Sequence, residues 1–87
     1  MARYYFHVRD RDGVVQDEEG SELPGMEEAR FEARMSARDL LVQDMLENRR
    51  DESRVIEIAD SDGTVLERVG LRDVMLDIVP PGDDETS

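Results

Sequence analysis

Polar and apolar residues alternate along the first segment of the chain. Within residues 3–9, every second residue from Tyr4 to Val8 is apolar, so one face of an extended strand would be apolar and the other polar. The sequence Asp10 to Gly13 then favours a turn, because the Asp side chain can bond the backbone two residues on and the Gly adopts positive φ. The pattern predicts a β-hairpin with its return strand directly after the turn.

The same pattern recurs fifty positions later. Residues 4–20 align without gaps on residues 54–70, and both Asp residues and the Gly of the turn are matched. Ile56 and Ile58 occupy the positions of the apolar residues in the first strand. We therefore expect two hairpins that present the same apolar face to one core. The register of the two return strands stays open, because both carry apolar residues on either face and a one-residue bulge would exchange them.

The segment between the hairpins predicts one long helix. Residues 18–24 form a polar connector, Gly25 serves as N-cap, and the helix runs to about Asn48. At roughly 100° per residue, one side of this helix is apolar and mostly small, which allows close packing on a sheet. That inner stripe consists of Met26, Ala29, Ala33, Ala37 and Leu40.

A second apolar stripe lies on the opposite side of the same helix. It consists of Phe31, Met35, Val42 and Leu46, with arginines on one flank and acidic or amide residues on the other. A helix that covers one sheet needs one apolar face, so the second stripe requires another explanation. Three are open: another subunit covers it, the C-terminal segment covers it, or it is exposed. If another subunit covers the stripe, these four residues form a candidate interface.

These patterns predict an α+β fold. Two antiparallel hairpins form one sheet of about four strands in unknown order, with the single helix packed on one face (ββαββ). Residues 1–79 are expected to form one domain, in which residues 71–79 make a short helical turn followed by a strand or extended arm. The acidic segment 80–87 is expected to be a disordered tail.

Composition limits the classes of partner. The 87 residues include 23 acidic residues and 11 basic ones, which give a formal charge of -12. Such a surface repels phosphate backbones, so we expect no nucleic-acid partner; a basic protein would be attracted. We also expect no membrane span, and the absence of cysteine fits a reducing compartment such as the cytoplasm. A domain of this size has a thin core, which favours a homodimer or larger homo-oligomer.

Candidate chemistry is sparse. The two Asp-x-Asp-Gly turns resemble part of a calcium loop, but Val8 and Ile58 stand where the first ligand is needed, so we interpret them as turns. His7 is the only histidine, expected beside Tyr5 and near Asp17 or Glu19, with no nucleophile in evidence. We therefore predict no catalytic residue, cofactor or metal, and a protein that is not an enzyme.

Several strings along the chain together resemble an uncharacterised family of short proteobacterial proteins, a domain of unknown function. They are residues 3–9, Asp17-Glu18-Glu19-Gly20, Leu23-Pro24, Glu28-Ala29-Arg30, residues 37–41 and Leu71-Arg72-Asp73-Val74. The resemblance implies a small cytosolic protein and supplies no catalytic residues. Residues 19–29 are also similar to the helix lead-in of HicB-type antitoxins, which implies masking of a basic partner.

The sequence therefore supports one main expectation of function and one alternative. The first is a non-enzymatic interaction module that self-associates through the second stripe of the helix. The alternative is a HicB-like antitoxin or inhibitor whose acidic surface masks a basic protein.

Overall fold

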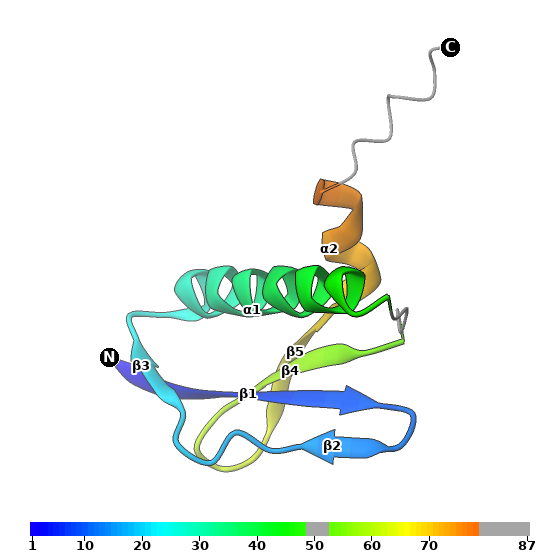
Figure 1. The fold of residues 1–87 in the computed structure, drawn as a ribbon. Helices are drawn as coiled ribbons and strands as arrows, with labels where there is room; N and C mark the ends of the chain where they lie inside the picture. Colours follow the sequence, from blue (N-terminus) through cyan, green and yellow to red (C-terminus); the bar gives the residue numbers. More distant parts are fainter. Residues whose placement is uncertain (49–52, 79–87) are drawn as a thin grey trace.

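Five strands and two helices make up the part of the chain that the computed structural model describes, residues 1–48 and 53–78 (Figure 1). The sheet is antiparallel, in the order β2-β1-β4-β5, with β3 also paired to β1. In chain order the elements are β1 (Ala2–Asp10), β2 (Gly13–Val15), β3 (Ser21–Leu23), α1 (Met26–Leu46), β4 (Val55–Ala59), β5 (Val65–Gly70) and α2 (Leu71–Ile78).

The two predicted hairpins are present and meet at the centre of the sheet. β1 and β4 are neighbours, and His7 pairs with Glu57, the residue fifty positions later. On either side of this equivalent pair the residues pair crosswise, Phe6 with Ile58 and Val8 with Ile56, so an approximate two-fold axis relates the first strands of the two hairpins. Phe6 opposite Ile58 and Val8 opposite Ile56 form the apolar face that the pattern predicted.

The return strands differ in register. Val8 pairs with Val15 in the first hairpin, whereas the equivalent Ile58 pairs with Glu67, because an irregularity lies between Ile58 and Ala59. The bulge was one of the two arrangements that the sequence left open. It occurs in the second hairpin only.

Both turns use the chemistry that the sequence predicted. Asp10 Oδ1 accepts hydrogen bonds from the backbone N–H of Asp12 and Gly13 at 2.8 and 3.0 Å. Asp60 Oδ1 accepts in the same way from Asp62 and Thr64, both at 2.9 Å. The first Asp of each turn is therefore engaged by the backbone.

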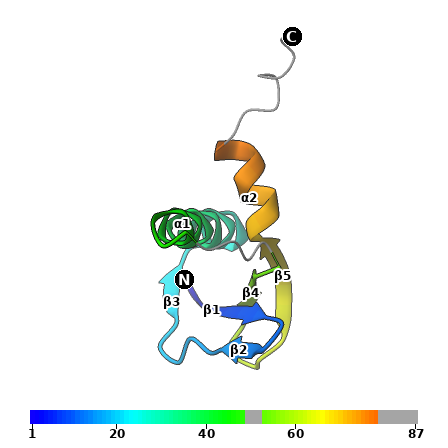
Figure 2. The same ribbon diagram turned by 45° about the vertical axis from the view of Figure 1, so that its right-hand side comes forward.

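α1 covers one face of the sheet (Figures 1 and 2). Its N-cap is Gly25, as predicted, and it ends at Leu46, followed by Asn48 in the left-handed region with φ 60°. An Asn at this place is a common helix stop, and its N–H donates to the Met45 carbonyl at 3.2 Å. The inner side chains Ala29, Ala33 and Ala37 are completely buried, which brings the helix close to the sheet.

Two parts of the fold differ from the prediction. The polar connector contains a short strand, β3, so the sheet has five strands where about four were expected. Residues 71–78 form one continuous helix, α2, in place of a helical turn and a strand. α2 begins directly at the end of β5, packs through the buried Leu71 and Val74, and donates the Leu71 N–H to the Arg54 carbonyl. The predicted tail, 80–87, lies outside the described residues.

β3 depends on a loop closed by Asp17 and Gly20. β2 pairs with the C-terminal end of β1 and β3 with its N-terminal end. Between them, Asp17 Oδ2 accepts the N–H of Phe6 at 3.1 Å, and Asp17 Oδ1 accepts that of Gly20 at 3.2 Å. Gly20 has φ 72°, and a Cβ there would lie 2.9 Å from Tyr5 Cε2.

Replacing Gly20 with Ala should destabilise the protein by about 2 kcal/mol or more, because strain at positive φ adds to the overlap with Tyr5. Gly63→Ala is the matched control, since Gly63 has φ 86° but no atom within 4 Å of the added Cβ. Urea unfolding followed by circular dichroism measures both free energies of unfolding. Equal losses in the two variants would show that the close approach to Tyr5 is unimportant.

Candidate functional site

The outer face of α1 is the candidate site. We use this name for the four residues of the second apolar stripe, which remain accessible in the structure. Their relative exposures are 63% for Phe31, 41% for Met35, 46% for Val42 and 81% for Leu46. Met45, which the sequence reasoning did not include, lies beside them and is 63% exposed. The signal for Met45 was its spacing, three residues after Val42 on the same helix.

The two faces of α1 differ in side-chain size as well as exposure. On the inner side, the three alanines and Leu41 are buried against the sheet. On the outer side, large side chains point away from it. Small residues allow the helix to approach the sheet, whereas large ones gain most from burial. The outer face therefore holds apolar area that the described residues leave exposed.

α2 packs beside α1 without covering the outer face. It stands at the C-terminal end of α1 and projects past it on the side away from the sheet (Figures 1 and 2). Its buried residues Leu71 and Val74 contribute to the same core as the inner face. Phe31 and Leu46 remain largely exposed.

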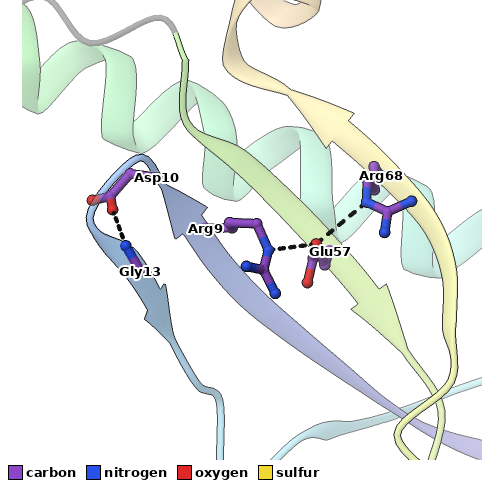
Figure 3. Close-up of polar contacts among 5 residues, drawn as sticks. All are labelled: Arg9, Asp10, Gly13, Glu57 and Arg68. Atoms are coloured by element: carbon purple, nitrogen blue, oxygen red, sulfur yellow. Dashed lines mark hydrogen bonds and ion pairs between the residues drawn. The ribbon is translucent and has the colours of Figure 1, made fainter.

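A buried carboxylate lies on the opposite face of the sheet (Figure 3). Glu57 in β4 is 2% exposed, although it points away from α1. Arg9 Nε in β1 donates to Glu57 Oε2 at 2.8 Å, and Arg68 Nε in β5 donates to the same oxygen at 3.3 Å. The hydrogen bond from Arg9 lowers the pKa of Glu57; burial acts against it and Arg68 assists it. This cluster links three neighbouring strands.

The only histidine is held by the loop between β2 and β3. As predicted, His7 lies beside Tyr5 and near Asp17: the rings of Tyr5 and His7 stack at 6.4 Å, and the Asp17 N–H donates to His7 Nδ1 at 3.0 Å. Burial raises the pKa of Asp17, but N–H donors from Phe6, Gly20 and Glu19 outweigh it and lower that pKa. The histidine and the carboxylate therefore hold the loop in place.

A second buried ion pair joins α1 to the start of β4. Asp44 is 6% exposed on the inner side of α1, and its Oδ2 accepts a hydrogen bond from Arg54. Sequence reasoning assigned no role to Asp44, which lies one turn after Leu40 on the same side of the helix. That position was its signal, because an acid on a buried face requires a cationic partner.

Within the described residues, no group of three or more His, Cys, Asp or Glu side chains is arranged to hold a metal ion. The buried carboxylates there, Asp44 and Glu57, bind arginines, and the half-buried Asp17 binds backbone N–H groups. None of the described helices combines the length and the hydropathy that a membrane span needs. Among the described residues, the outer face of α1 is an apolar surface that no other helix or strand covers.

Residues 3–72 match the model of a protein family described as a domain of unknown function (DUF6894). The chain belongs to this family. The match runs from the second residue of β1 to the beginning of α2, so it spans the described strands from there on, the outer face of α1 and the Glu57 cluster. Neither the curated proteins nor the solved structures gave a match. Family membership confirms the resemblance to a domain of unknown function and assigns no activity.

The stability of the fold should fall in acid, because Asp17 and Glu57 both have pKa values lowered by folding. A lowered pKa stabilises the folded state above the ordinary values, 3.8 for Asp17 and 4.5 for Glu57, and this contribution is lost as the pH falls below them. We expect the melting temperature to fall steeply below about pH 4.5. Thermal unfolding by circular dichroism across this range measures the effect.

Replacing Glu57 with Gln should reduce that acid sensitivity and cost about 1 to 3 kcal/mol at neutral pH, because two arginines lose a charged acceptor. Glu67→Gln is the matched control: Glu67 pairs with Arg30 at 2.8 Å, but both side chains are more than a third exposed. An exposed pair contributes little. An acid transition unchanged by Glu57→Gln would contradict the assignment.

Proposed function

We propose that this protein is a cytosolic, non-enzymatic interaction module that self-associates through the outer face of α1. The observation that carries the proposal is the exposure of Phe31 and Leu46 together with the apolar residues between them. Contiguous apolar surface on a small soluble domain commonly marks a contact with another molecule. A second copy of the chain is the simplest molecule that presents a matching apolar surface.

The thin core supports this proposal. The largest completely buried side chains are Ile56, Ile58, Leu71 and Val74. The outer face and Met45 together offer five further large apolar side chains. Pairing would therefore bury more large apolar side chains in each copy than the four that are completely buried in the described core. The same limitation applies to small domains generally, which often complete their cores by oligomerisation.

The energy of such pairing is moderate. Ten large apolar side chains in a pair of copies, each about half exposed, gain on the order of 10 kcal/mol when buried. Association itself costs about 4 to 15 kcal/mol of translational and rotational freedom. We therefore expect a reversible dimer whose population depends on protein concentration.

The formal charge of -12 favours a second candidate, inhibition of a basic protein. The two proposals differ in what should happen to the isolated chain. An inhibitor that works by charge alone needs no partner copy, so its purified form would be monomeric and would bind a basic protein with strong dependence on salt.

Replacing Phe31 and Val42 with Asp should convert the dimer to a monomer, because two charges would be buried in an apolar contact. Light scattering after size-exclusion chromatography should give about twice the 10.0 kDa chain mass for the natural protein and the single mass for the variant. Both side chains are exposed within the protomer, so the variant should fold normally, which circular dichroism checks.

Val15→Asp is the matched control, since Val15 is 71% exposed but lies on β2, outside α1. It should leave the dimer intact. A natural protein with the mass of one chain at all concentrations would refute self-association. Loss of the dimer in Val15→Asp would show that the contact lies at the sheet edge and not on α1.

A further inference from the structure

The outer face of α1 has a symmetric spacing. Phe31 and Leu46 are the outermost pair, and Met35 and Val42 are the inner pair. The midpoints of both pairs coincide, between positions 38 and 39. If a second helix ran antiparallel with a two-fold axis at this point, Phe31 would meet the partner copy's Leu46, and Met35 would meet its Val42. A two-fold interface requires this reciprocity, in which residue i contacts j and j contacts i.

The two residues at the midpoint carry opposite charges. Arg38 and Asp39 would lie opposite each other across the axis, so the arrangement would create two equivalent ion pairs. Within the described part of the chain, neither side chain has a hydrogen bond or ion pair. Other charged residues of the same helix do have partners, such as Arg30 with Glu67. The charges at the centre of the outer face are thus complementary to a second copy in this orientation.

We infer that two copies pair through α1 as an antiparallel, two-fold helix pair centred between Arg38 and Asp39. The inference rests on the proposed self-association and adds its orientation and register. Contact along the whole outer face extends over about 22 Å of helix, from Phe31 to Leu46, at 1.5 Å per residue. Helices remain in contact over that length only at a shallow crossing angle, near 20°.

A parallel pair fits the same surface poorly. It would place Arg38 beside the partner copy's Arg38 and Asp39 beside its Asp39, so like charges would meet at the centre of the contact. It would also bring both α2 helices to the same end of the pair, because α2 stands at the C-terminal end of α1 and projects past its outer side (Figures 1 and 2). In the antiparallel pair the two α2 helices lie at opposite ends.

Disulfide trapping tests the orientation, and the chain contains no natural cysteine to interfere. We expect an equimolar mixture of Met35→Cys and Val42→Cys to form a mixed disulfide dimer under mild oxidation. Each variant alone should crosslink poorly, because like positions would lie about 10 Å apart along the helices. A disulfide needs Cα atoms within about 7 Å. Efficient crosslinking of Met35→Cys alone would overturn the antiparallel register.

Charge exchange at the centre is the second measurement. Arg38→Asp and Asp39→Arg should each weaken the dimer by about tenfold, since like charges would face each other across the axis. The double variant R38D/D39R should restore the dimer to near the natural affinity. Net charge cannot explain this pattern, because the two single variants change it in opposite directions and the double variant leaves it unchanged. Additive weakening in the double variant would refute the central ion pairs.

Failure of this inference can be distinguished from failure of the proposed function. If the natural protein is dimeric and the Phe31 and Val42 double variant is monomeric, self-association stands whatever the crosslinks show. Absence of the mixed disulfide would then remove only the antiparallel register. A monomeric natural protein would remove both.

Discussion

The structure is governed by a mismatch between one helix with two apolar faces and one sheet that can cover only one of them. The inner face is built from alanines, which let α1 lie close to β4 and β5. Close approach leaves little volume for large side chains between the layers, so the core is thin. The large apolar residues of α1 stand on the other side, where nothing in the described chain covers them.

The internal repeat explains how such a small sheet is organised. Equivalent strands β1 and β4 pair at the centre, with His7 opposite Glu57, and each hairpin adds its return strand outside. The two strands differ, however, in what their equivalent polar residues, His7 and Glu57, contact. His7 bonds to the loop at Asp17, whereas Glu57 lies between two arginines of neighbouring strands. One position of the repeat therefore fastens a loop and the other fastens three strands together.

Local signals predicted the parts of the fold that local interactions determine. The two turns depend on an Asp that bonds the backbone a few residues on, and the limits of α1 depend on Gly25 and Asn48, so short segments were sufficient. β3 was missed because Ser21 to Leu23 carries no strand pattern of its own. It forms because Asp17 and Arg3 hold this segment against β1. The buried state of Glu57 depends on arginines 48 and 11 residues away in sequence, which no pattern within one strand reveals.

The acidic composition constrains how two copies could meet. Each chain carries a formal charge of -12, so copies repel each other at a distance, and a contact surface must avoid adding to that repulsion. Along the outer face of α1 the central charges are one Arg and one Asp, which cancel. Much of the acidic excess lies elsewhere, at exposed positions such as Asp12, Glu18 and Asp62. A contact centred on one Arg and one Asp adds no net charge at its middle, so it would meet less repulsion than a contact through acidic surface. A high net charge generally opposes non-specific association, so in a chain of this composition the local charge of a surface would help to select the mode of pairing.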